Sequence, residues 1–122
     1  PIDPDDMLPA TCQGAIGIEC REGDQDTRTL LAAVNDQATA TCIAAERAFL
    51  GALDGSCRTP IAGLATISGD RVSLRGLIVR PDGSETLAAQ DDAPRADAAL
   101  LGRTLGEALR GRAGPGFFDD LT

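Results

Sequence analysis

One short stretch divides the chain into a helical half and a strand-forming half: Asp54-Gly55-Ser56-Cys57-Arg58-Thr59-Pro60-Ile61. An amphipathic helical pattern precedes it and ends near Leu53, and alternating apolar residues follow it. Gly55 and Ser56 add little side-chain bulk and permit tight or left-handed backbone conformations. The sequence therefore predicts a loop that presents Cys57 between the last helical turn and the first strand.

The cysteine of this loop has two interpretations. Arg58 beside it favours the thiolate, which is the nucleophilic form of cysteine. Alternatively, Cys57 is a small apolar side chain that closes the loop onto the core, because free cysteine is among the residue types most often buried. Local chemistry alone leaves both open.

Two helices are expected before the loop. Apolar residues predict a short helix over residues 27–34, and Asn35 and Asp36 offer capping groups for the next one. The apolar stripe of that longer helix consists of Ala38, Cys42, Ala45, Phe49 and Leu53. Cys42 is therefore assigned to the core, whereas Glu46 and Arg47 are expected on a solvated face.

Three strands are expected after the loop, over residues 61–67, 72–79 and 86–90, joined by turns that contain Gly69 and Gly83. A last helix should begin at Pro94, with leucines at 101, 105 and 109 on one face. Phe117 and Phe118 form an apolar tail that can dock back. We therefore expect an α+β fold, with a three-stranded antiparallel sheet packed against helices.

Residues 13–21, near the start of the chain, show a short β-like run interrupted by Gly14 and Gly17. Glycine inside a strand often marks a bulge or a place where a ligand approaches the backbone. A glycine-rich edge strand without a ligand explains the same residues equally well.

Composition narrows the function classes. The net charge is −8, with 11 arginines and neither lysine nor histidine, which disfavours nucleic-acid and membrane-surface partners. No apolar run is long enough for a membrane span. Lack of histidine excludes Ser-His-Asp and Cys-His pairs and, with no Cys-x-x-Cys spacing, argues against a structural zinc site. The four cysteines are expected to be reduced thiols in a cytoplasm.

From the residues alone, three descriptions remain: an attachment module whose special residue is Cys57, a binding or redox module with a reactive Cys57, and an inert structural domain. No carboxylate is marked as a general acid or base by an apolar setting.

Several stretches, in order along nearly the whole chain, resemble the C-terminal part of the hydroxymethylbilane synthase (porphobilinogen deaminase) family. They are residues 8–21 (LPATCQGAIGIECR), 45–48 (AERA), 53–61 (LDGSCRTPI), 74–77 (LRGL) and 81–84 (PDGS). Several motifs in the right order are far more specific than any one of them.

The resemblance implies a transferase that condenses four porphobilinogen units, with loss of ammonia, onto a dipyrromethane primer and releases hydroxymethylbilane. It implies that Cys57 holds this dipyrromethane cofactor through a thioether, formed when its thiolate captures an electrophilic azafulvene. It also implies that Arg21 holds acetate and propionate groups of the growing polypyrrole, a role that suits a bidentate guanidinium. Gln13 and Gly14 would approach the same cleft, and Arg47 either pairs with carboxylates or holds its helix.

Two departures from the family pattern stand out. Cys12 occupies a position where glycine is usual, and Ser56 occupies one where a second glycine is common. Cys12 would restrict the backbone near the cleft or offer a second thiol.

The family is also longer than this chain, and its catalytic aspartate lies upstream, so no catalytic residue is assigned here and the fragment alone should be inactive. Residues 1–33 would be the returning strand and helix segment of an upstream α/β domain, and residues 34–122 the C-terminal cofactor-attachment domain. The full enzyme is expected to be a monomer, with the upstream domains as partners. Alone, the first segment would be disordered or would pair with a second copy of the chain.

Overall fold

The computed structural model describes residues 1–55 and 59–119. In chain order the elements are α1 (Gln25–Ala32), α2 (Gln37–Ala52), β1 (Ile61–Ser68), β2 (Arg71–Val79), β3 (Thr86–Pro94), a short 3-10 turn η1 (Arg95–Asp97) and α3 (Ala98–Ala113). The strands pair antiparallel in the order β1-β2-β3. The α+β class and the three-stranded meander expected from the sequence are confirmed.

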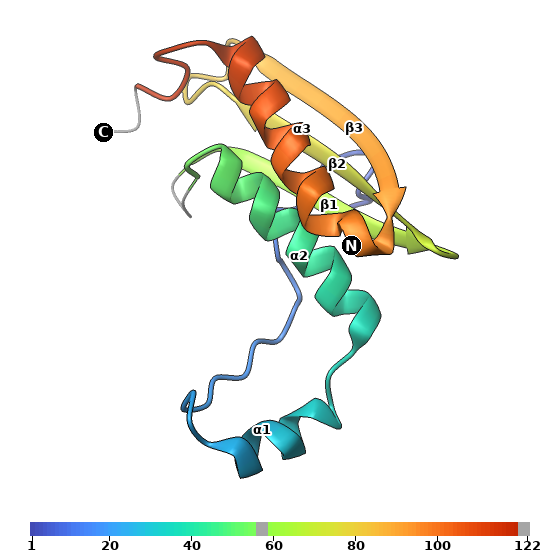
Figure 1. Cartoon of the computed structure of the whole chain (residues 1–122). Coiled ribbons are helices and arrows are strands. Elements are labelled where there is room, and N and C mark those ends of the chain that lie inside the picture. Colours follow the sequence, from blue (N-terminus) through green and yellow to red (C-terminus); the bar gives the residue numbers. More distant parts are fainter. Residues whose placement is uncertain (56–58, 120–122) are drawn as a thin grey trace.

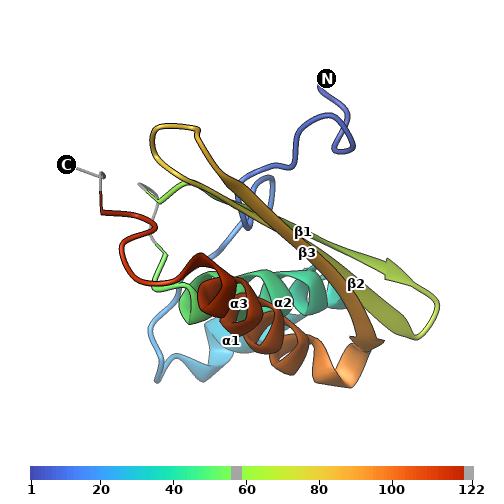
Figure 2. The same cartoon turned by 90° about the horizontal axis from the view of Figure 1, so that it is seen from above.

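The sheet and the two long helices form two layers. α2 and α3 lie side by side across one face of the sheet, and the N-terminal segment runs on the other side (Figures 1 and 2). The core lies between the layers, where Phe49 of α2, Leu74 and Ile78 of β2 and Leu109 of α3 are fully buried. The stripe residues Ala45, Phe49 and Leu53 are buried as expected, and Phe117 docks back onto the core.

Close approach of the two helices depends on glycine. A Cβ atom at Gly102 of α3 would lie 2.0 Å from the carbonyl oxygen of Ala45, and one at Gly106 would lie 2.8 Å from that of Phe49. These distances lie far inside van der Waals contact, so α2 and α3 can pack backbone to backbone only because both positions lack side chains.

The N-terminal ends of α1 and α2 are each capped by an aspartate. The Asp36 carboxylate accepts a 2.7 Å hydrogen bond from the Thr39 N–H, and Asp24 accepts one of 3.0 Å from the Thr27 N–H at the start of α1. These bonds satisfy backbone donors that have no partner within the helix, as N-cap residues commonly do. The same bonds lower the pKa of both carboxyl groups. The capping role expected of Asp36 is confirmed.

Three details differ from the sequence-based expectation. Residues 13–21 form no strand, because this segment is extended without a partner strand beside it in the described residues. β3 runs on to Pro94, since Asp91 and Asp92 pair with β2 and the Asp92 carboxylate binds Arg71 across the strands. Pro94 thus ends a strand, and α3 begins four residues later.

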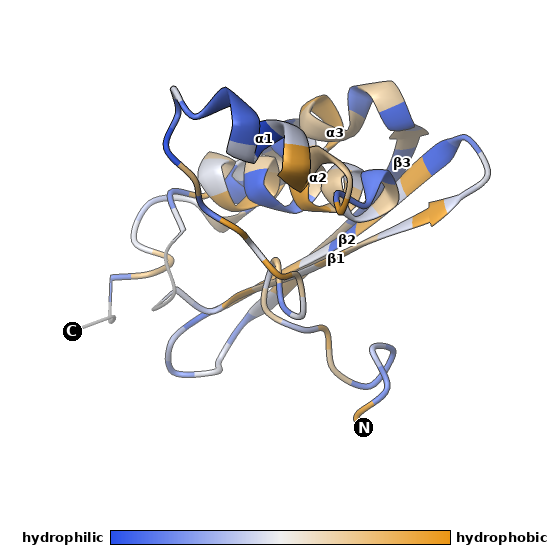
Figure 3. Ribbon diagram, turned by 90° about the horizontal axis from the view of Figure 1, so that it is seen from below, coloured by the Kyte–Doolittle hydropathy of each residue, from blue (hydrophilic) through white to orange (hydrophobic). Residues whose placement is uncertain are grey.

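Residues 1–36 are less buried than the rest of the described chain, and none of them is fully buried. α1 buries none of its residues and stands apart from the two layers, at the end of an extended segment (Figure 1). Figure 3 shows hydrophobic colour on that extended segment and on part of α1. Ile16 is 91% exposed and Leu30 is 74% exposed.

In the described part of the chain no helix has the length and apolar character needed to cross a bilayer.

Candidate functional site

The loop that follows α2 is anchored at its first residues. Asp54 adopts a left-handed backbone conformation, with φ of 52°, and the Gly55 N–H donates a 3.0 Å hydrogen bond back to the Leu50 carbonyl. Arg110 at the end of α3 reaches across to this turn, pairing with the Asp54 carboxylate at 2.7 Å and donating to the Ala52 carbonyl at 3.2 Å. The stem of the loop is therefore fixed from both long helices.

Gly55 is closely packed against the ends of two side chains. A Cβ atom at Gly55 would lie 2.5 Å from Cδ1 of Leu50 and 2.6 Å from Cδ1 of Ile61. Asp54, and not Gly55, adopts the left-handed conformation that follows the end of α2. On the far side of the loop, the Val79 N–H donates a 3.0 Å bond to the Pro60 carbonyl, which attaches the start of β1 to the end of β2. Cys57, the residue singled out in the sequence, lies outside the described residues.

A hollow of about 570 Å³ opens between the extended segment and the helices α1 and α2. Gly14 and Cys12 line one wall, Arg47 and Asp36 line the other, and most of the remaining lining is apolar: Ala15, Ile16, Ile18, Leu31, Val34, Ala40 and Ile43. A single guanidinium in an apolar hollow can pair with a carboxylate group of a ligand. The structure thus brings two of the sequence-selected residues, Gly14 and Arg47, to one place.

Gln13 and Arg21 lie outside that lining. Gln13 is exposed, and its N–H donates a 3.3 Å bond to the Ala10 carbonyl within a tight turn. The side chain of Arg21 is 91% exposed and lies 3.7 Å from the Asp24 carboxylate. Both residues are exposed, and the described residues do not bring them together with Arg47.

Cys12 sits in a strained position. Its φ is 63°, a region that costs a non-glycine residue about 1–2 kcal/mol. Burial and the neighbouring Glu46 carboxylate raise the pKa of its thiol, although Arg47 works in the opposite direction. Cys12 is thus less ionised than an ordinary cysteine at neutral pH, which argues against a second nucleophile at this point.

Glu46 is the residue that sequence reasoning placed wrongly. It was expected on the solvated face of α2, yet it is only 5% exposed. One carboxylate oxygen accepts a 2.6 Å bond from the Cys12 N–H, and the other accepts a 2.7 Å bond from the Ala65 N–H. Position 46 directly follows the stripe residue Ala45, so it borders the buried face. That adjacency was the one signal available in the sequence.

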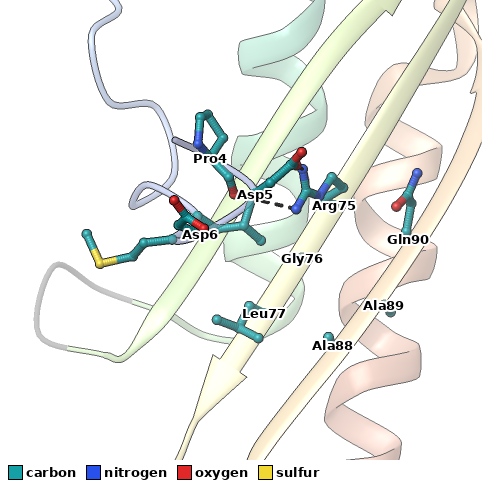
Figure 4. Close-up of a pocket in the computed structure, with 11 residues that line it drawn as sticks. Pro4, Asp5, Asp6, Arg75, Gly76, Leu77, Ala88, Ala89 and Gln90 are labelled. Carbon is teal, nitrogen blue, oxygen red and sulfur yellow. Dashed lines mark hydrogen bonds and ion pairs between the residues drawn. The ribbon is translucent and has the colours of Figure 1, made fainter. Parts of the chain in front are cut away.

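A second hollow, of about 470 Å³, lies on the outer face of the sheet (Figure 4). The N-terminal segment crosses this face, and Asp5 forms a 2.6 Å ion pair with Arg75 of β2. Leu77, Ala88 and Gln90 complete the floor. Because the guanidinium is already paired with Asp5, this hollow offers a ligand less charge than the first one.

Comparisons with known proteins identify the family. The model described as porphobilinogen deaminase, C-terminal domain, matches residues 40–111, and the model described as porphobilinogen deaminase, dipyromethane cofactor binding domain, matches residues 1–29. The porphobilinogen deaminase of Paracoccus denitrificans (strain Pd 1222) is 58% identical over 118 residues, covering 97% of this chain and 38% of that protein.

A second relative, the porphobilinogen deaminase of Nitrobacter hamburgensis (strain DSM 10229 / NCIMB 13809 / X14), is 46% identical over 117 residues, covering 96% of this chain and 37% of the relative. The chain therefore spans less than two fifths of the length of these relatives. By the match to the C-terminal domain over more than half of its residues, the chain belongs to the porphobilinogen deaminase family.

Proposed function

We propose that this chain is the cofactor-carrying C-terminal part of a hydroxymethylbilane synthase, with Cys57 as the attachment point of a dipyrromethane held through a thioether. The enzyme would condense four porphobilinogen units onto this primer and release hydroxymethylbilane with loss of ammonia. The observation that carries the proposal is the family match over residues 40–111, which has the loop of Cys57 within it.

The loop stem suits a covalent attachment point. Asp54 is held by Arg110, Gly55 is packed against Leu50, and Pro60 is bonded to β2. The two described ends of the loop are thus tied to α3, α2 and β2. A bound dipyrromethane would supply the free pyrrole end to which new units are added, and a thioether is not exchanged by cellular thiols.

Arginine and backbone groups of residues 13–21 would bind the substrate and the growing polypyrrole. We propose Arg21, Gln13 and Gly14 as cofactor- and substrate-binding residues. Polypyrroles of this kind carry acetate and propionate groups, and a planar guanidinium binds carboxylates through two hydrogen bonds. Gly14, with φ of 80° and open space beside it, lets a ligand approach the backbone. Arg47 faces the same hollow and is the next candidate.

We further propose that residues 1–33 complete an upstream α/β domain and that residues 34–122 form the attachment domain. The lack of buried residues in α1 and the exposure of Ile16 support this division. The catalytic aspartate would lie in the upstream part, so this chain alone should not turn over. Cysteines 12, 20 and 42 are free thiols, which fits a reducing cytoplasm.

Activity measurements on the full-length protein test the assignment. With porphobilinogen as substrate, Cys57→Ser should abolish tetrapyrrole formation, because serine cannot form the thioether. Cys20→Ser, at an exposed position, is the matched control and should retain normal turnover. Tetrapyrrole formation by Cys57→Ser protein would overturn the attachment role. Turnover by the 122-residue chain alone would overturn the assignment of catalysis to upstream residues.

A further inference from the structure

Glu46 is a buried carboxylate that the proposed chemistry does not use. It is 5% exposed in α2, and within the described residues no arginine forms an ion pair with it. Burial of a carboxylate is costly unless hydrogen bonds compensate for the lost water. Its two hydrogen bonds are therefore expected to be strong structural restraints.

These two bonds tie together segments that are far apart in the chain. Cys12, which donates to Oε2, lies 34 residues before Glu46, and Ala65, which donates to Oε1, lies 19 residues after it. The two donor–acceptor distances, 2.6 and 2.7 Å, are short for N–H···O hydrogen bonds. One side chain thus joins the N-terminal segment, α2 and β1.

The edge of β1 explains why a carboxylate is needed there. β1 pairs with β2 on one side only, so alternate N–H groups point away from the sheet. The Ile61 N–H donates to the Thr59 carbonyl, and the Gly63 N–H donates to the Pro9 carbonyl at 3.0 Å. The next outward donor is that of Ala65, which Glu46 accepts.

The N-terminal segment therefore follows the edge of β1 for a few residues and then leaves it at Glu46. Ala10 forms an isolated bridge with Ala62, and the methyl group of Thr11 covers Gly63, where a Cβ atom would lie 2.9 Å from it. The chain then turns away through residues 11–14. The carboxylate holds Cys12, which lies within that turn.

We propose that Glu46 is a positioning residue: by binding the Cys12 and Ala65 N–H groups together, it sets where Gln13 and Gly14 lie relative to β1. The link to the cofactor rests on the proposed function of Cys57, Gln13 and Gly14. The hydrogen bonds of Glu46 to Cys12 and Ala65 do not depend on that function.

A direct test uses the unmodified 122-residue chain. Nuclear magnetic resonance detects scalar coupling through a hydrogen bond between an amide nitrogen and a carboxylate carbon. Coupling from both the Cys12 and the Ala65 amide nitrogens to Cδ of Glu46 is the expected result. Its absence at Cys12 in the folded chain would overturn the proposal.

A variant pair tests the energetic side. In Glu46→Gln, the amide group keeps only one acceptor oxygen and turns N–H donors toward one of the two partners. Amide exchange at Cys12 and Ala65 should become roughly 10- to 100-fold faster, and more so than at Leu105 in the core. Glu107→Gln, at an exposed position of α3, is the control and should leave all of these rates unchanged. Equal acceleration at Leu105 and Cys12 would indicate global destabilisation and contradict a local anchor.

Activity of the full-length protein tests the link to the cofactor. At a temperature where both proteins are fully folded, Glu46→Gln should lower kcat for porphobilinogen by roughly tenfold or more, and Glu107→Gln should not. An unchanged kcat would overturn the positioning role in catalysis. The coupling and exchange results stand independently of any pyrrole adduct, so failure of the anchor and failure of the proposed function are distinguishable.

Discussion

The two parts of this chain obtain their order in different ways. Residues 37–119 contain both long helices, the whole sheet and every side chain of the buried core. Residues 1–36 contain α1, which buries none of its own residues, and a segment attached to the edge of β1 by a few bonds. The first part closes its own core, whereas the second part has exposed apolar side chains that the described residues leave uncovered.

The difference between the two parts agrees with how little of the relatives' length this chain covers. This chain covers 38% of the Paracoccus protein, so most of that protein lies outside it. Exposed Ile16, Ile18, Leu30 and Val34 form an apolar surface of the kind that a further domain could cover. This supports the division proposed above, in which residues 34–122 form the attachment domain and residues 1–33 complete an upstream one.

Removing a core side chain should show most clearly that the two parts differ in their contribution to the free energy of unfolding. Phe49→Ala deletes a fully buried ring at the centre of the core and should lower the free energy of unfolding by about 3–5 kcal/mol. Leu30→Ala in α1 removes a side chain that is already exposed and should change it by less than about 0.5 kcal/mol. Urea unfolding followed by circular dichroism measures both. Comparable losses would mean that α1 belongs to the same folding unit.

A second pair of substitutions tests the contact between α2 and α3. Gly102→Ala places a methyl group against the Ala45 carbonyl and should destabilise the chain by at least about 2 kcal/mol. Gly111→Ala in the same helix meets open space and should stabilise it by about 0.5–1 kcal/mol. The same unfolding assay applies. A stabilising Gly102→Ala would show that the two helices are not packed backbone to backbone.

The attachment of the N-terminal segment should tighten when Cys12 is replaced. Cys12→Gly relieves the left-handed strain at this position, but it also increases the freedom of the unfolded chain. We expect a net gain of less than about 1 kcal/mol, confined to the segment. It should appear as slower amide exchange at positions 10–14, with no change in α3. Faster exchange there would contradict the assignment of strain to Cys12.

The smallest expected effect concerns the N-cap of α2. The Thr39 N–H lowers the pKa of Asp36 below its ordinary value, so the charged form is favoured by folding. This contribution is present above the unfolded pKa and is lost as pH falls through the folded pKa. Asp36→Ala should therefore lower the Tm slightly at pH 7, and this difference should become smaller as pH falls through the folded pKa. A difference that grows as pH falls would contradict a contribution from the charged cap.

The sequence predicts the fold of residues 37–119 well. Alternation and turn residues locate the meander, and the stripe through Phe49 locates the buried face of α2, because these signals are local. Glu46 and Pro94 were misplaced because contacts with distant segments decide their environment: Ala65 and Cys12 bury the carboxylate, and pairing with β2 extends the strand. Residues 13–21 look strand-like, but a strand needs a neighbour, and the described residues place none beside them.

The candidate site shows the same pattern. Motifs alone led to Cys57, Arg21, Gln13 and Gly14, and the structure adds the Arg110–Asp54 contact and the Glu46 anchor around them. Arg110 follows Asp54 by 56 residues, so no local pattern connects the two. Contacts between distant segments that hold a loop in place are therefore the part of a site that is hardest to predict from sequence.

The most direct test of the central proposal is a tryptic mass map of the full-length protein, isolated from cells in active form. Cleavage after Arg47 and Arg58 gives the peptide of residues 48–58, whose one cysteine is Cys57. We predict that this peptide carries the added mass of two linked pyrroles and that the peptides containing Cys12, Cys20 and Cys42 are unmodified. Active enzyme with an unmodified Cys57 would contradict the attachment of the cofactor to this loop.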